Sequence, residues 1–156
     1  MPIYTKKGDR GFTILNNKKL KKSDAVFEAL GDLDELNANL GLARFKMKDE
    51  RFKNIIKNIQ ILFIDLMAEI ANCQKETIDW NAETEKLETE IDKLMKNKNI
   101  NHFIIPGENE LSALLNISRA ICRRAERSLT KLKGCKNIKK FVNRLSDYLF
   151  ALSINI

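Results

Sequence analysis

Residues 116–127 read Asn-Ile-Ser-Arg-Ala-Ile-Cys-Arg-Arg-Ala-Glu-Arg, and their spacing is that of an amphipathic α-helix. With about 100° of rotation per residue, one arc of this helix and its extensions carries only apolar or small side chains: Leu111, Leu114, Ser118, Ile121, Cys122, Ala125, Leu129 and Leu132. A different face holds Arg119 and Arg123, four residues apart, with Asn116, Glu126 and Arg127. Clustered guanidinium groups suit phosphate oxygens, so the segment predicts a core helix that also binds an anion. The alternative is a solvated face with an Arg123–Glu126 pair.

The rest of the chain also favours helices, because only two prolines and six glycines interrupt its 156 residues. Apolar residues recur with the helical period in five segments, at Ser23–Phe45, Asp49–Cys73, Ala82–Lys96, Glu110–Lys131 and Asn137–Ser153. We therefore expect an all-α fold, a five-helix bundle, in a single domain over residues 1–156. Residues 1–22 are expected to form an N-terminal arm, and residues 23–154 the bundle.

Composition and charge narrow the class of protein. The chain is 44% hydrophobic and 31% charged, which is usual for a globular domain, and no apolar run could cross a bilayer or serve as a secretory signal. We expect a cytoplasmic protein without a membrane partner. Three widely spaced cysteines predict neither a disulfide framework nor a cysteine metal site. The net charge of +7 suits nucleic acid or a nucleotide, but much of it lies in Lys18–Lys22, which is expected to be a solvated loop.

The predicted first helix has two apolar stripes instead of one. The first consists of Val26, Ala29, Leu33, Leu36, Leu40 and Ala43. The second lies about 130° away and consists of Phe27, Leu30, Asp34, Ala38, Gly41 and Phe45. A monomer needs to bury only one stripe, so the second predicts a subunit interface where Asp34 meets Arg119 or Arg123 of a neighbouring chain. The alternative is a bundle tight enough to bury both stripes internally.

Two further segments carry polar groups suited to a ligand. Thr5–Thr13 has glycines that permit close backbone approach, beside hydroxyls and cations that can bind phosphate, although its spacing is not that of a Walker A loop. Alone, it is a weak signal, because the same spacing occurs in many ordinary turns. On the predicted fifth helix, Asn143 and Asp147 face away from the apolar side, beside Phe150. That arrangement suits either a pocket between subunits or a solvated face.

Five motifs occur in order along nearly the whole chain. They are Thr-Lys-x-Gly-Asp-x-Gly-x-Thr at Thr5–Thr13, Glu-Ala-x-Gly-x-x-Asp-Glu-Leu-Asn at Glu28–Asn37, Phe-Ile-x-Pro-Gly at Phe103–Gly107, Arg-Arg-Ala-Glu-Arg at Arg123–Arg127 and Asn-Arg-Leu-Ser-Asp at Asn143–Asp147. The series closely resembles the PduO-type ATP:cob(I)alamin adenosyltransferases. Five ordered motifs are much harder to obtain by chance than any one of them.

The resemblance implies an enzyme, a homotrimer of five-helix bundles with active sites between subunits. Its substrates would be ATP and a reduced corrinoid, whose Co(I) centre attacks the 5′-carbon of ATP to give adenosylcobalamin and triphosphate. Magnesium (Mg2+) would bridge the phosphates, and no side chain is assigned as a metal ligand. The implied protein partners are a cob(II)alamin reductase and a B12-dependent acceptor enzyme.

The resemblance also implies roles for individual residues. The ATP-binding residues would be Thr5, Lys6, Gly8, Asp9, Gly11 and Thr13 of the arm, with Arg123, Glu126 and Asn143 of the helices. Arg123 and Lys6 would be catalytic, by stabilising charge on the departing triphosphate. Asp34 would form an intersubunit salt bridge with Arg119, and Phe103 would bind the corrinoid by pressing on its lower face. Because Co(I) is already a strong nucleophile, no side chain has to act as a base.

Three positions depart from the family pattern. Glu108 stands where a second glycine is usual, Asn116 where a histidine is usual, and Val26 where an arginine is usual. These departures leave open a non-catalytic sensor of the same fold that binds ATP or a corrinoid. A basic helical module for nucleic acid is the alternative from another class, although no aromatic series is interleaved with the basic residues. The lone His102 is expected at the surface instead of on cobalt.

Overall fold

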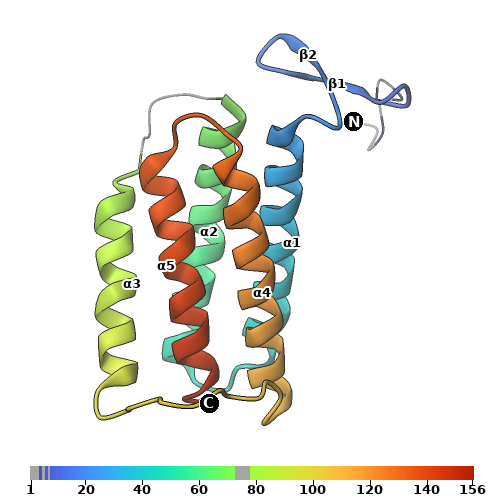
Figure 1. The fold of residues 1–156 in the computed structure, drawn as a ribbon. Helices are drawn as coiled ribbons and strands as arrows, with labels where there is room; N and C mark the ends of the chain where they lie inside the picture. The colour runs from blue at the N-terminus through green and yellow to red at the C-terminus, as the bar shows by residue number, and fades with distance from the viewer. Residues whose placement is uncertain (1–3, 5, 7, 73–77) are drawn as a thin grey trace.

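A computed structural model describes residues 4, 6, 8–72 and 78–156 of the chain, and most of them belong to helices (Figure 1). The helices are α1 (Ala25–Lys46), α2 (Glu50–Asn72), α3 (Trp80–Met95), α4 (Glu110–Thr130) and α5 (Lys136–Ser153). Each boundary lies within two residues of its predicted position. The predicted all-α class and five-helix bundle are therefore confirmed. None of the helices in the described ranges combines the length and the apolar character needed to span a membrane.

The helices pack in the order α2, α1, α4, α5, α3, so that α4 lies between α1 and α5. The predicted apolar face of α5 is fully buried and consists of Ile138, Phe141, Val142, Leu145, Tyr148, Leu149 and Leu152. Trp80, at the start of α3, packs on Phe141 with 5.2 Å between ring centroids. Its indole Nε1 donates a hydrogen bond of 2.7 Å to Glu69 Oε2 of α2. The first residues of α3 thus join three helices, which fixes α3 and α5 relative to α2.

The N-terminal arm contains a β-hairpin that the sequence reasoning did not predict. Strand β1 (Phe12–Leu15) pairs antiparallel with β2 (Lys18–Lys21), so the interpretation of Lys18–Lys22 as a loop was wrong. The two-residue turn consists of Asn16 and Asn17, with φ values of 49° and 59°. Asparagine tolerates this left-handed region better than most residues do, and such turns match the twist of paired strands. Asn16 also donates through Nδ2 to the Ala71 carbonyl at 3.2 Å, which ties the hairpin to the end of α2.

The two stripes of α1 have different environments. The first is buried in the core, except that Val26 at the start of the helix is only partly buried. On the second stripe, Asp34 and Ala38 are exposed and Phe45 has 78% of its surface accessible. The alternative that one bundle buries both stripes is therefore wrong. The subunit interface stays a prediction, because the structure contains one chain.

Candidate active site

Four arginines lie along α4, and the fold of the single chain uses one of them in ion pairs. Arg124 turns toward α1, where its guanidinium pairs with two carboxylates. Arg119, Arg123 and Arg127 form no ion pair with any residue that the structure describes. Their spacing of four residues rotates each by about 40° from the one before, so they form a row along one side of α4. We call Arg119, Arg123 and Arg127 the arginine row. Unpaired guanidiniums in a row are suited to a polyanion.

Arg119 is held in place at the start of this row. Its Nε donates to Asn116 Oδ1 at 3.2 Å, and its guanidinium lies 5.6 Å from the ring centroid of Phe150 on α5. Asn116 is itself buried and donates through Nδ2 to the Ser112 carbonyl at 3.0 Å. The residue that departs from the family's usual histidine therefore orients Arg119. The sequence reasoning did not assign Asn116 this role.

Glu126 and Asn143 meet at the seam between α4 and α5. Asn143 Nδ2 donates to Glu126 Oε1 at 2.9 Å, so the structure brings together two of the predicted ATP-binding residues. This bond occupies Glu126, and the alternative Arg123–Glu126 pair does not form. Within the described residues, no hydrogen bond uses Glu126 Oε2 or Asn143 Oδ1. Both oxygens can accept from a ligand or coordinate a cation, one turn from Arg123.

The arm supplies a second group of predicted residues. Lys6, Gly8, Asp9 and Thr13 line one hollow of about 1080 Å³, together with Arg10, Phe12, Ile14, Lys19 and Lys22. The lining is strongly basic, which favours an anionic ligand. Lys19 and Lys22 are site residues that the sequence reasoning missed, because Lys19 lies on the unpredicted strand β2 and Lys22 directly follows that strand.

Two glycines of the arm, Gly8 in the lining of this hollow and Gly11 outside it, suit their positions for distinct reasons. A Cβ at Gly8 would lie 2.8 Å from Lys22 Nζ, so the backbone and that ammonium group approach closely. Gly11 has a φ of 76°, which glycine adopts without strain, and its carbonyl accepts from the Lys22 amide at 2.8 Å. Of the predicted arm residues, Thr5 lies outside the described residues.

The arm and the arginine row remain separate within one chain. The hairpin lies beyond the N-terminal end of α1 (Figure 1), and no hydrogen bond or ion pair between described residues joins residues 4–22 to α4 or α5. The structure therefore brings together Glu126 and Asn143 near Arg123, and separately Lys6, Gly8, Asp9 and Thr13. It does not bring Lys6 to Arg123.

The predicted corrinoid and interface residues are accessible. Phe103 is fully exposed, at 102% of its reference surface, in the loop between α3 and α4, and neighbouring Ile105 is 85% exposed. Asp34 is exposed and forms no ion pair within the described ranges. Among those same residues, no group of three or more His, Cys, Asp or Glu side chains is placed to hold a metal ion.

Fold and site together define a helical bundle with a row of arginines that is suited to a polyanion. Comparison with known proteins identifies its family. The family described as cobalamin adenosyltransferase matches residues 3–156 of this chain. The corrinoid adenosyltransferase PduO of Salmonella typhimurium is 35% identical over 98% of this chain, which spans about half (49%) of that relative's length. The human corrinoid adenosyltransferase MMAB is 36% identical, and the chain spans 67% of it. The Bacillus subtilis corrinoid adenosyltransferase is 34% identical, and the chain spans 84% of it.

Solved structures agree with this assignment. A variant of the PduO-type ATP:corrinoid adenosyltransferase from Lactobacillus reuteri, complexed with cobalamin and ATP, superposes with a TM-score of 0.91. The two are 31% identical, and the match covers 97% of this chain and 89% of that one. This chain belongs to the cobalamin adenosyltransferase family, as the five ordered motifs predict.

Proposed function

We propose that this chain transfers the 5′-deoxyadenosyl group of ATP to the Co(I) centre of a reduced corrinoid, forming adenosylcobalamin and releasing triphosphate. The observation that carries the proposal is the arginine row beside the Glu126–Asn143 pair, in a chain that belongs to this family. Within the described residues these guanidiniums have no carboxylate partner, whereas a triphosphate supplies the oxygens that they can bind.

In the proposed reaction, the two electrons of the cobalt–carbon bond come from Co(I), which becomes Co(III). The bond between the 5′-carbon and its phosphate oxygen breaks, and triphosphate leaves with that electron pair. The protein's task is to align the two substrates and stabilise the new charge on the leaving group. Arg123 of α4 and Lys6 of the arm take the second task in this proposal. Glu126 and Asn143 fix the nucleotide beside them.

We propose a homotrimer in which the arm of one chain reaches the arginine row of its neighbour. Support comes from the separation of the two halves within one chain and from the exposure of Asp34, Ala38 and Phe45 on the second stripe of α1. Asp34 on that stripe would pair with Arg119 of the adjacent chain. Arg119 suits this partner because its contacts with Asn116 and Phe150 orient it without neutralising its charge.

The corrinoid would bind at the loop that carries Phe103. A fully exposed aromatic ring is suited to press on the flat lower face of a corrin, and neighbouring Ile105 adds exposed apolar surface. Excluding the lower ligand would ease reduction of the cobalt to its nucleophilic state. A cob(II)alamin reductase would supply the electron, and a B12-dependent enzyme would receive the product.

Magnesium is the remaining cofactor of the proposal. Glu126 fits such a cation, because its Oε2 forms no hydrogen bond in the described part of the chain, and carboxylate oxygens are hard ligands. A magnesium ion held by Glu126 would supply positive charge that offsets the charge of the phosphates. The residues Arg123 and Lys6 then have to offset only the charge that develops on cleavage.

The test is to mix the protein with ATP, magnesium and chemically reduced cobalamin, and to follow the visible spectrum. We expect loss of Co(I) absorbance and formation of adenosylcobalamin, with triphosphate released in equal amount. No product from folded protein that still binds ATP would favour the sensor of the same fold. Tight, salt-sensitive binding to nucleic acid without product would favour the basic module instead.

A further inference from the structure

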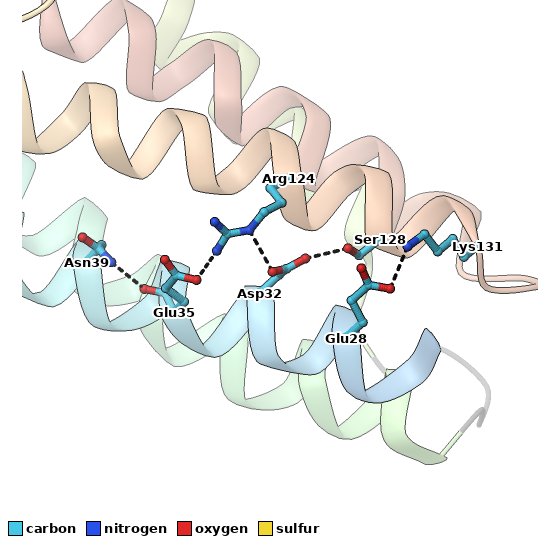
Figure 2. Close-up of polar contacts among 7 residues, drawn as sticks. All are labelled: Glu28, Asp32, Glu35, Asn39, Arg124, Ser128 and Lys131. Atoms are coloured by element: carbon cyan, nitrogen blue, oxygen red, sulfur yellow. Dashed lines mark hydrogen bonds and ion pairs between the residues drawn. The ribbon is translucent and has the colours of Figure 1, made fainter. Parts of the chain in front are cut away.

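A polar seam between α1 and α4 fixes how the two helices sit on each other (Figure 2). Asp32 of α1 accepts from two α4 donors one turn apart, Arg124 Nε at 2.9 Å and Ser128 Oγ at 2.5 Å. Glu35 pairs with the same guanidinium through Nη2. The Asp32 side chain is 14% exposed, whereas those of Arg124 and Glu35 are 44% and 48% exposed, so the Asp32 carboxylate is the shielded part of the seam. Two donors from one helix on one carboxylate define both the rotation and the height of α4.

We infer that Asp32 is a positioning residue of the active site, which acts through Arg124 and Ser128 to hold Arg123 in its catalytic placement. The inference rests on the proposed function, because it assigns Asp32 to the same reaction. Asp32 does not touch the arginine row, and it would not contact ATP from the core side of α4. Its influence is mechanical, through the orientation of one helix.

The geometry gives this influence a magnitude. Arg123 is the residue directly before Arg124, so any rotation of α4 that moves Arg124 moves Arg123 equally. Side chains reach about 6 Å from a helix axis, so a 10° rotation displaces them by about 1 Å. A displacement of about 1 Å between reacting groups can lower a rate by about a hundredfold. The seam therefore controls catalysis if it controls the rotation of α4.

The seam also keeps α1 carboxylates away from the arginine row. Glu28, Asp32 and Glu35 lie on one side of α1. Asp32 and Glu35 pair with Arg124 of α4, and Glu28 pairs at 2.6 Å with Lys131, the residue that caps the C-terminal end of α4. A carboxylate engaged by Arg124 cannot compete with phosphate for Arg123. The hydrogen bond to Asp32 and the charges of Asp32 and Glu35 raise the pKa of Arg124.

Two substitutions of Asp32 distinguish its effect on the placement of α4 from the effect of its charge. Asp32→Ala removes both contacts to α4. Asp32→Asn removes the charge but can keep both contacts, since Oδ1 accepts from Arg124 and Nδ2 donates to Ser128 Oγ. Glu28→Ala is the matched control, because it deletes an α1–α4 ion pair of the same seam at a site where both side chains are 52% exposed. Each variant is assayed at a temperature where circular dichroism shows it fully folded.

We expect Asp32→Ala to lower kcat by at least tenfold with the corrinoid KM unchanged, and Asp32→Asn to stay within about threefold of wild type, as a positional role requires. Glu28→Ala should keep the wild-type kcat. Wild-type kcat in folded Asp32→Ala would overturn the inference, and so would an Asn variant as slow as the Ala variant, which would point to charge. A wild-type protein that forms no adenosylcobalamin would instead refute the proposed function, so the two failures are distinguishable.

Discussion

Removing the Arg123 guanidinium should abolish most of the activity while leaving the fold intact. Arg123 is exposed and has no ion pair among the described residues, so Arg123→Ala should change the free energy of unfolding by less than about 0.5 kcal/mol. If the guanidinium stabilises charge on the departing triphosphate, its loss costs about 2–4 kcal/mol of transition-state stabilisation. That corresponds to a rate reduction of roughly 30-fold to 1000-fold.

A second arginine gives the matched control. Arg51 of α2 is also exposed, but it pairs with Glu90 of α3 on the other side of the bundle. Arg51→Ala should lower the free energy of unfolding by up to about 1 kcal/mol and leave turnover unchanged. Arg123→Ala should therefore lower the turnover rate without changing the stability, whereas Arg51→Ala should lower the stability without changing the turnover rate.

Two measurements on each variant test whether Arg123 belongs to the active site. Turnover is followed by the disappearance of Co(I) absorbance at saturating ATP and corrinoid, and stability by urea unfolding monitored with circular dichroism. If Arg123 acts only in the transition state, kcat and kcat/KM for ATP fall by the same factor. Near-normal turnover of Arg123→Ala, or an equal loss in Arg51→Ala, would remove Arg123 from the site.

Three further predictions follow from burial. Trp80→Phe should lower the free energy of unfolding by about 2–4 kcal/mol in urea titrations, because it deletes the buried hydrogen bond to Glu69 and part of the core. Phe103→Ala should leave the urea midpoint unchanged, since the ring is exposed, yet slow transfer to cobalamin; equal rates would contradict a corrinoid role. Burial raises the pKa of both Cys122 and Tyr148 above their ordinary values of 9.0 and 10.0. The unfolded chain therefore loses these protons first, so urea midpoints should fall as pH rises above about 9, and a flat profile to about pH 10.5 would show otherwise.

The helices could be predicted from the sequence because each carries its apolar residues at the helical period. In α5, all seven predicted core residues are buried, from Ile138 to Leu152. The hairpin was missed because β2 contains three lysines, which charge patterning alone assigns to a loop. Its local sign was present in Asn16-Asn17, a pair of residues that tolerate positive φ between two short extended segments. Attention to turn chemistry would have found it.

The candidate site was predictable as a set of residues but not as an arrangement. Ordered motifs identified Glu126 and Asn143, and only packing of α4 on α5 could show that the two side chains bond. Helical spacing placed Arg123 with Arg119 on a polar face, but it assigned no partner to the adjacent Arg124. Their roles differ because Arg124 faces the carboxylates of α1, a contact between residues nearly a hundred positions apart. Long-range pairing of this kind has no local pattern in the sequence.

Arg124 of α4 is ion-paired with α1 and the arginine row is not, and this difference indicates that the row binds a ligand outside the single chain. Like charges four residues apart on a helix destabilise it by about 0.2–0.5 kcal/mol per pair, and Arg119, Arg123 and Arg127 form two such pairs. Fold stability alone would favour a carboxylate within the row. The carboxylates of α1 pair with Arg124 and Lys131 instead, and Glu126 is engaged by Asn143. The fold thus supplies counter-charges beside the row and leaves the row without one, which is the arrangement that a site for triphosphate requires.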